Sequence, residues 1–295
     1  MALTKHPIAD LIARRGGLVI DGAMSTPLEA AGLNLNDTLW SAKALLECPD
    51  LVRKVHYDYY AAGANAVEAC SYQATEAAFA RKGIEKAEAS RLIRLSGELV
   101  REAKNDALLE HPEWDPADLL TAGSIGPYGA YLADGSEYTG AYNLTREEYY
   151  AFHQLRLDEL LNSGMDILAI ETQPRFDEIE ALLAMIADRD ITCWVTVTLK
   201  DGDMPDGTKL EVLAKCLDAD PHVEAFGFNC VKREWVEPGL KRLSAYTDKP
   251  LVVYPNSGET YDPTTKTWHA QGVHEPDWNH YVPLWEHTGA RCIGG

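Results

Sequence analysis

The sequence contains no run of about 18 apolar residues, which is the length that a membrane-spanning helix needs. Its N-terminus, MALTKHPIADLIARRGG, also lacks the apolar stretch that a secretory signal peptide requires. We therefore expect a cytoplasmic protein that does not bind a membrane.

Basic residues are scarce relative to acidic ones. The chain has 27 Lys and Arg against 46 Asp and Glu, a formal net charge of −19. A field of this sign repels phosphate backbones and anionic lipid surfaces. Nucleic acid is therefore not expected as a partner.

Two kinds of motif are missing. The six cysteines include no Cys-x-x-Cys pair, and the chain is too long to need disulfide bonds, so reduced thiols are expected. Neither GxGxxG nor GxxxxGK[ST] follows the first apolar run, which argues against an open, doubly wound nucleotide-binding sheet.

Short apolar runs bounded by Gly, Pro, Asn or Asp recur along the whole chain. They are almost continuously hydrophobic, which is typical of strands buried on both faces of a parallel sheet. The eight runs are LVIDGA (18–23), AVEACS (66–71), LLTAGSIG (119–126), ILAIET (167–172), CWVTVTL (193–199), AFGFNC (225–230), LVVYPN (251–256) and ARCIGG (290–295).

The segments between these runs have helical patterns. Apolar residues recur at helical spacing within 51–59 and 95–103, for example. Thr145 and Thr208 each precede a glutamate by three residues, which is the spacing of a capping box at the start of a helix. The sequence thus predicts seven helices between eight strands.

Strands and helices that alternate at about 39 residues per unit predict an α/β fold, a (β/α)8 TIM barrel. With 46% hydrophobic residues, the 295-residue chain can bury one large core, so 1–295 is expected to form a single domain. The last run reaches Gly295, so residues 1–295 end at the eighth strand without the final helix that would close the outer ring of the barrel.

Polar residues gather at the ends of five predicted strands, where the active site of such a barrel lies. They are Asp21, Gly22 and Ala23 at the end of the first run, Tyr72 after the second, Glu171 in the fourth, Asn229 and Cys230 in the sixth, and Asn256 in the seventh.

These residue types are suited to an amino-acid ligand. Asp21 and Glu171 can hold an ammonium group, or act as an acid/base pair if burial separates their pKa values. Gly22 allows backbone N–H groups to approach a ligand carboxylate. Cys230 is a candidate nucleophile or metal ligand, although a structural thiol is the alternative, and no second ligand lies near it in the sequence.

A long excursion over 127–143, rich in tyrosine, follows the third run. Glycines within it can serve as hinges, so one interpretation is a lid that excludes water from the site. The other is a surface loop that packs on its own side chains.

Several motifs, which together cover essentially the whole chain, resemble the homocysteine S-methyltransferases. The similarity is closest to the enzymes that use S-methylmethionine or S-adenosylmethionine. The motifs are DGAMSTPLEAAG (21–32), NDTLWSAKALLECPDLVRKVHYDYYAAGAN (36–65), SYQAT (71–75), AGSIGPYGAYLADGSEYTG (122–140), VVYPNSGETYDPTTKTWH (252–269) and GARCIGG (289–295).

This resemblance implies one zinc ion per complete chain. The family holds it with the cysteine that corresponds to Cys230 and with two adjacent cysteines that would directly follow Gly295. Cys292 precedes the Gly-Gly pair and does not correspond to either of them. We therefore expect the natural chain to continue, and we do not expect residues 1–295 alone to bind zinc.

The resemblance also implies the reaction, which is methyl transfer from a sulfonium donor to the thiol of homocysteine, giving methionine. Asp21 and Glu171 would hold the homocysteine ammonium, and the Gly22–Ala23 backbone would hold its carboxylate. The other expected contacts are Tyr72, Asn229 and Asn256 around the substrate, and Tyr128 and Tyr138 on the donor side.

Two other functions remain open from the residues themselves. A metal-free lyase or isomerase would use Asp21 and Glu171 as acid and base. A homologue that binds amino acids without catalysis would also be consistent with the sequence.

Overall fold

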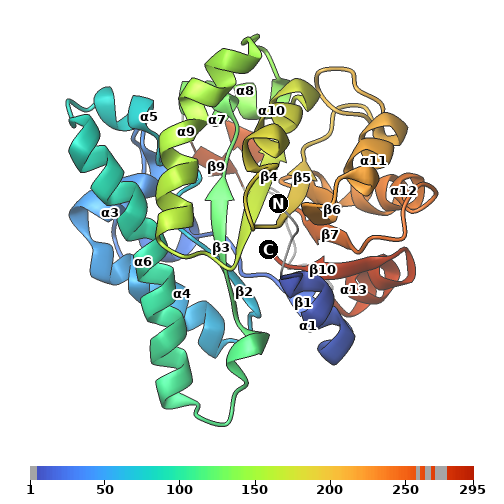
Figure 1. The fold of residues 1–295 in the computed structure, drawn as a ribbon, viewed down its shortest axis with the longest axis horizontal. Helices are drawn as coiled ribbons and strands as arrows, with labels where there is room; N and C mark the ends of the chain where they lie inside the picture. The colour runs from blue at the N-terminus through green and yellow to red at the C-terminus, as the bar shows by residue number, and fades with distance from the viewer. Residues whose placement is uncertain (1–4, 257–259, 263–266, 270–277) are drawn as a thin grey trace.

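Residues 5–256, 260–262, 267–269 and 278–295 are described in a computed structural model, in which a curved parallel sheet is surrounded by helices (Figure 1). Each strand of this sheet coincides with one of the predicted apolar runs. The strands are β1 (Leu18–Val19), β2 (Ala66–Glu68), β3 (Leu120–Ile125), β4 (Ile167–Gln173), β5 (Cys193–Val197), β6 (Val223–Asn229), β7 (Leu251–Tyr254) and β10 (Ala290–Ile293).

The strands pair in the order β1-β10-β7-β6-β5-β4-β3-β2. Leu18 of β1 pairs in parallel with Cys292 of β10. At the opposite edge of the sheet, Ile20 forms a parallel bridge with Ala66 of β2, which brings the two edges together. The predicted (β/α)8 TIM barrel is confirmed.

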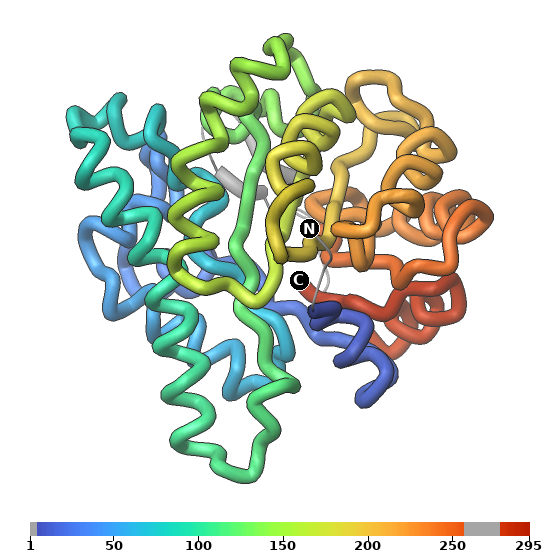
Figure 2. The backbone as a smooth tube through the Cα atoms, in the orientation of Figure 1, coloured from blue at the N-terminus to red at the C-terminus, as the bar shows by residue number. Residues whose placement is uncertain are grey.

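One long helix lies in each connection between successive barrel strands and covers the outside of the barrel (Figure 2). These helices confirm the predicted helical segments. They are α4 (Pro49–Ala61), α6 (Lys86–Glu110), α9 (Arg146–Asn162), α10 (Phe176–Ile186), α11 (Leu210–Ala219), α12 (Arg233–Leu243) and α13 (Trp278–His287).

Shorter elements lie in the loops between these. They are α2 (Ser25–Ala30), η1 (Trp40–Lys43), α3 (Ala44–Glu47), α5 (Glu76–Ala80), η2 (Pro116–Asp118), α7 (Tyr128–Leu132), α8 (Ser136–Thr139) and the antiparallel pair β8 (Thr260–Asp262) and β9 (Thr267–His269). Within the part of the chain that is described, no helix is long and apolar enough to cross a lipid bilayer.

One of the two predicted capping boxes is confirmed. The Thr145 side chain accepts a hydrogen bond from the backbone of Glu148, and the Glu148 side chain accepts one from the backbone of Thr145. The prediction at Thr208 was wrong, because α11 has Lys209 at its N-cap without a side-chain cap. The carboxylate of Glu211 instead accepts a hydrogen bond from Arg242 Nε at 2.9 Å.

A further helix, α1 (Pro7–Arg15), precedes the barrel and is absent from the predicted set of helices. Its Ile8 and Leu11 are 0% exposed and pack among the apolar side chains inside the barrel. The backbone N–H of Ala9 donates to Glu224 near the start of β6 at 2.9 Å. Arg14 Nε donates to Asp118, just before β3, at 3.1 Å. The helix thus closes the end of the barrel at which the strands begin.

Side chains inside the barrel change character along the strands. Alternate residues of a strand share a face, so a polar residue two positions after an interior apolar one also points inward. The apolar interior positions include Ala66, Ala122, Ala169, Trp194 and Val252. The positions two residues later are Glu68, Ser124, Glu171, Thr196 and Tyr254. A polar layer therefore lies above the apolar one, toward the carboxyl ends of the strands.

The outer side of β1 borders a groove of about 1040 Å³. Its apolar wall includes Val19 of β1, Tyr59 and Ala62 of α4, and Trp278 and Val282 of α13. In the described part of the chain, β10 is the last element.

Candidate functional site

A cavity of about 510 Å³ opens at the carboxyl ends of the barrel strands. It is lined by every residue for which the sequence predicted a role in binding homocysteine or a metal ion. These are Asp21, Gly22, Ala23, Tyr72, Glu171, Asn229, Cys230 and Asn256. The barrel topology is what brings them together, because they come from loops and strand ends far apart in the chain. Of the two tyrosines expected on the donor side, only Tyr138 lines the cavity.

Asp21 lies directly after β1 and is 7% exposed. Its Oδ2 accepts a hydrogen bond from the backbone N–H of Glu68 at 3.1 Å. Its carbonyl oxygen accepts the N–H of Gly295 at 3.1 Å. Burial raises the pKa of Asp21 well above its usual value, and the charge of Glu171 acts in the same direction, whereas the hydrogen bond from Glu68 opposes it.

Glu171, in β4, is 6% exposed and has several hydrogen-bond donors around it. Ser124 Oγ donates to Oε1, while Asn229 Nδ2 and the hydroxyl of Tyr254 donate to Oε2 at 3.3 and 3.2 Å. Burial raises the pKa of Glu171 to about 7, although the hydrogen bonds from Ser124 and Tyr254 favour the carboxylate. Asp21 and Glu171 therefore form a buried acidic end of the cavity.

Cys230 follows β6 in a left-handed backbone conformation, with φ of 50°. Its N–H donates to the carbonyl oxygen of Tyr254 at 3.2 Å. Asn229 Nδ2 lies 3.6 Å from its sulfur, and Thr172 Oγ1 lies 3.8 Å from it. Burial, together with the charge of Glu171, raises the pKa of the Cys230 thiol to about 12.

Gly22 and Ala23 lie beside Tyr59 of α4. The Tyr59 hydroxyl donates to the carbonyl oxygen of Ala23 at 3.0 Å. A Cβ atom on Gly22 would lie 2.9 Å from that hydroxyl oxygen, which is closer than non-bonded carbon and oxygen atoms approach. A larger residue at position 22 would therefore require the loop or the Tyr59 ring to shift.

The excursion over 127–143 contains the short helices α7 and α8, and Glu137 and Tyr138 of α8 line the cavity. Tyr128 does not line it. The ring of Tyr128 packs against Tyr142 and Phe152, at centroid distances of 5.5 and 4.9 Å. Both interpretations of this segment thus have support, since it packs on its own rings and also carries side chains into the site.

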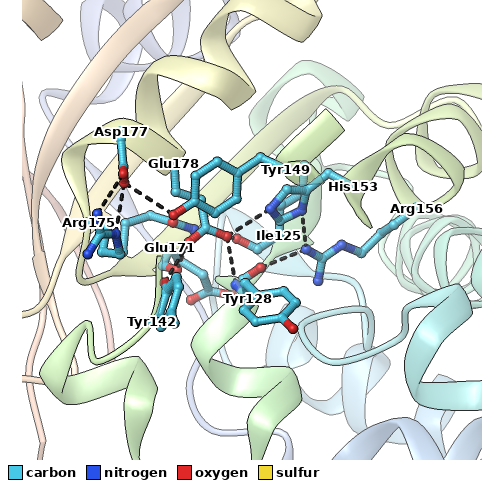
Figure 3. Close-up of polar contacts among 12 residues, drawn as sticks. Ile125, Tyr128, Tyr142, Tyr149, His153, Arg156, Glu171, Arg175, Asp177 and Glu178 are labelled. Carbon is cyan, nitrogen blue, oxygen red and sulfur yellow. Dashed lines mark hydrogen bonds and ion pairs between the residues drawn. The ribbon is translucent and has the colours of Figure 1, made fainter. Parts of the chain in front are cut away.

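Glu178 of α10, which is 0% exposed, connects this segment to the site (Figure 3). Its Oε1 accepts the N–H of Tyr128 at 2.6 Å, and its Oε2 accepts the hydroxyl of Tyr142 at 2.5 Å. His153 Nε2 also lies 2.8 Å from Oε1, and His153 Nδ1 lies 2.7 Å from Arg156 Nη2. An arginine can only donate, so Nδ1 is the acceptor and His153 is the neutral tautomer with its proton on Nε2.

Arg156 links Glu178 and His153 to the backbone next to the cavity. Its Nη1 donates to the carbonyl oxygen of Tyr72 at 2.5 Å, and its Nη2 donates to that of Gly126 at 2.6 Å. Because Tyr72 lines the cavity, Glu178 and Arg156 fix the position of the segment over 127–143 relative to the site.

Sequence reasoning missed Glu68, Ser124, Tyr254 and Glu137, all of which line the cavity. The first three could have been found from strand periodicity, since each lies two residues after an apolar residue that faces the barrel interior. Glu137 lies in a loop helix, and no local pattern indicates that it points toward the strands.

In the described residues, no group of three or more His, Cys, Asp or Glu could hold a metal ion. Two cysteines line the cavity, Cys70 and Cys230. The thiol of Cys70 donates to the carbonyl oxygen of Ser41 at 3.4 Å and is buried. Of these two cysteines, Cys230 is the potential ligand that the sequence predicted.

Comparison with known proteins decides the family. Residues 18–295 match the family model described as homocysteine S-methyltransferase. The chain belongs to the homocysteine S-methyltransferase family. It is 48% identical over 292 residues to the homocysteine S-methyltransferase of Escherichia coli, covering 98% of this chain and 94% of that protein. It is 42% identical to homocysteine S-methyltransferase YbgG of Bacillus subtilis, covering 98% and 93%.

A solved structure of the family agrees with the fold. The metallated form of the homocysteine methyltransferase MmuM from Escherichia coli superposes with a TM-score of 0.88 at 45% identity, covering 98% of this chain and 94% of that one. Membership of the homocysteine S-methyltransferase family makes this protein an enzyme, a methyltransferase that acts on homocysteine. The cavity at the carboxyl ends of the strands is its candidate active site.

Proposed function

We propose that this enzyme transfers a methyl group from S-methylmethionine or S-adenosylmethionine to the sulfur of homocysteine, giving methionine. The observation that carries this proposal is the cavity in which the buried carboxyls of Asp21 and Glu171 lie together with Cys230. The two buried carboxyl groups can bind the ammonium of an amino acid, and the substrate sulfur would lie near Cys230.

Homocysteine would be held by its two charged groups. Asp21 and Glu171 would accept hydrogen bonds from its ammonium, and the backbone at Gly22 and Ala23 would bind its carboxylate. Tyr72, Asn229 and Asn256 line the same cavity and would shape it around the side chain. This arrangement would aim the substrate sulfur toward the end of the cavity near Cys230.

The proposed chemistry is a direct displacement. The homocysteine thiolate attacks the methyl carbon of the sulfonium, a new S–C bond forms, and the old C–S bond breaks with its electron pair returning to the donor sulfur. The donor leaves as a neutral thioether, so no base is needed at this step. The protein's contribution is to align the two sulfurs and to exclude water, which Tyr138 and Glu137 on the segment over 127–143 would assist.

We propose that the enzyme uses a zinc ion, which would supply stabilisation of the homocysteine thiolate. Cys230 would be one ligand, and two cysteines expected directly after Gly295 would be the others. The position of Gly295 supports this proposal, because it lines the same cavity as Cys230. The similarity to a solved structure of a metallated Escherichia coli homologue supports it as well.

The six cysteines are all unpaired, which is consistent with the reducing cytoplasm that we propose as the location. We further propose that residues 1–295 form one homocysteine-binding barrel domain.

Metal content and methyl transfer together test the proposal. The protein with its natural C-terminus should contain about one zinc ion per chain and should methylate homocysteine with either sulfonium donor. Cys230→Ser should lose both the zinc and the activity. Cys216→Ser, which changes a partly exposed cysteine in α11, is the matched control and should keep both. Full zinc retention in Cys230→Ser, or no transfer to homocysteine by the wild type, would contradict the proposal.

A further inference from the structure

Glu68 is a third carboxyl group at the acidic end of the cavity. It is the last residue of β2 and shares a strand face with Ala66, whose side chain belongs to the apolar cluster inside the barrel. The side chain of Glu68 therefore points inward, and it lines the cavity together with Asp21 and Glu171. The hydrogen bond from its N–H to Asp21 Oδ2, at 3.1 Å, fixes the two residues relative to each other.

One carboxylate oxygen at this end has no hydrogen-bond donor among the described residues. Glu68 Oε1 is shielded from solvent and has no hydrogen-bond partner in the described part of the chain. The carboxylate of Glu171, in contrast, receives donors from Ser124, Asn229 and Tyr254. A buried acceptor without a donor costs about 1–3 kcal/mol, which a ligand that donates to it can recover.

The charges at this end also favour a cation. Burial, together with the charges of Glu171 and Asp21, raises the pKa of Glu68 well above its usual value, although a hydrogen bond with the Tyr254 side chain favours the carboxylate. The charge of Arg156 does favour the ionised form of Glu171. However, the guanidinium of Arg156 donates its hydrogen bonds to the carbonyl oxygens of Tyr72 and Gly126. A bound cation would relieve the repulsion among the three carboxyl groups.

We propose that Glu68 is a specificity-determining residue that accepts a hydrogen bond from the ammonium group of homocysteine, alongside Asp21 and Glu171. An ammonium has three N–H donors, so each of the three carboxyl groups can receive one. The inference rests on the proposed function, because it requires homocysteine in this cavity. Its consequence is that the enzyme discriminates between thiols that carry an amine and thiols that do not.

The test compares homocysteine with 4-sulfanylbutanoate, which has the same thiol and carboxylate but no amine. Calorimetry measures the binding of each to the full chain, and steady-state methyl transfer gives KM and kcat. Glu68→Gln should weaken homocysteine binding and raise its KM by about tenfold or more, the loss expected for one charge-assisted hydrogen bond. Its kcat, and its binding of 4-sulfanylbutanoate, should stay within about twofold of wild type.

Glu224→Gln is the matched control. Glu224 is also a buried glutamate on a barrel strand, but it lies at the opposite end, where it accepts the N–H of Ala9. This variant should bind both thiols as the wild type does. Glu68→Asp keeps the charge but withdraws the carboxyl group by one methylene. It should show the same selective loss for homocysteine, and it serves as the second variant if Glu68→Gln does not fold.

Two results would overturn the inference while the proposed function stands. In one, wild type and Glu68→Gln methylate and bind homocysteine equally well. In the other, the Glu68 variants bind homocysteine and 4-sulfanylbutanoate more weakly than the wild type by the same factor, which would indicate that Glu68 only shapes the cavity. If the proposed function itself is wrong, the wild type will neither bind nor methylate homocysteine, which distinguishes that result from the two above.

Discussion

The side-chain amide of Asn229 holds Thr172 by two hydrogen bonds. Asn229 Oδ1 accepts the N–H of Thr172 at 2.8 Å, and Asn229 Nδ2 donates to Thr172 Oγ1 at 2.7 Å. Thr172 has a φ of 56°, a left-handed conformation that is unfavourable for a β-branched residue. Asn229 thus stabilises a strained strand end directly after Glu171, and it does so from a position next to Cys230.

Asn229→Ala should therefore impair both stability and substrate binding. The variant leaves the buried N–H of Thr172 without a partner, which should lower the free energy of unfolding by about 1–3 kcal/mol. It should also raise the KM for homocysteine by about tenfold, because Glu171 loses a donor and a fixed backbone. Urea unfolding and steady-state kinetics measure the two effects.

Asn65→Ala is the control for that variant. Asn65 also bridges two backbone segments, since its Oδ1 accepts the N–H of Val19 and its Nδ2 donates to the carbonyl oxygen of Asp118. These contacts lie at the other end of the barrel. A similar loss of stability with an unchanged KM is expected, and an equal rise in KM in both variants would show that the effect is not specific to the site.

Gly22→Ala should disturb the loop after β1. The new Cβ would lie 2.9 Å from the Tyr59 hydroxyl oxygen, so either the loop or the ring must move. We expect a higher KM for homocysteine, with a smaller change in kcat. The double variant Gly22→Ala/Tyr59→Phe removes the hydroxyl and should recover part of the loss. If the double variant is no better than Gly22→Ala, the clash with this hydroxyl is not the cause.

The sequence predicted all eight strands because each is an apolar run bounded by turn-forming residues. The barrel then followed from the lack of a phosphate-binding glycine loop and from the regular spacing. Helix α1 was not predicted, since it lies outside the repeating unit, although Ile8, Leu11 and Ile12 recur at helical spacing within its nine residues. Its role depends on the shape of the barrel end, which only the folded structure provides.

His56 should make the protein sensitive to acid. It lies in α4, is 0% exposed, and neither ring nitrogen has a hydrogen-bond partner in the described part of the chain. Burial lowers the pKa of His56 to about 3. The unfolded chain binds this proton near pH 6.5, so His56 leaves stability unaffected above that pH and reduces it as the pH falls from about 6.5 to 3.

His56→Leu should thus raise the free energy of unfolding at neutral pH, because an unpaired polar ring is replaced by an apolar side chain. The gain should increase between pH 6.5 and 4, by at most about 1.4 kcal/mol per pH unit. Denaturant unfolding at several pH values measures it. His287→Gln, at an exposed position, should follow the wild type, and a gain in His56→Leu that does not change with pH would contradict the assignment.

Glu178→Gln should loosen the segment over 127–143. The variant loses the negative charge that accepts hydrogen bonds from His153, the N–H of Tyr128 and the hydroxyl of Tyr142. We expect the free energy of unfolding to fall by about 3 kcal/mol. Limited proteolysis should cut this segment faster. Asp177→Asn, next to it in sequence but with a partly exposed side chain, should show a much smaller effect in both measurements. Equal proteolysis of the two variants would exclude a positioning role for Glu178.

Every site residue predicted from strand ends lies in one cavity, but Glu68 was missed for a physical reason. The apolar run over 66–71 was interpreted as strand throughout, which placed the strand end near Tyr72. In the structure β2 ends at Glu68, and the residues that follow belong to a turn. Periodicity from Ala66 indicates that Glu68 faces the barrel interior, but the end of a strand inside a continuous apolar run depends on its neighbours, which the run itself does not reveal.

The pairing of Leu18 with Cys292 has a consequence for the order of assembly during synthesis. β1 emerges from the ribosome first, but its partner β10 is the last strand to emerge. Until then β2 to β7 can form only an open sheet, whose edge at β7 has unpaired backbone groups that invite association with other chains. We expect the nascent protein to be most prone to aggregation just before β10 is complete, and translational pausing shortly upstream of residue 290 to lower its yield.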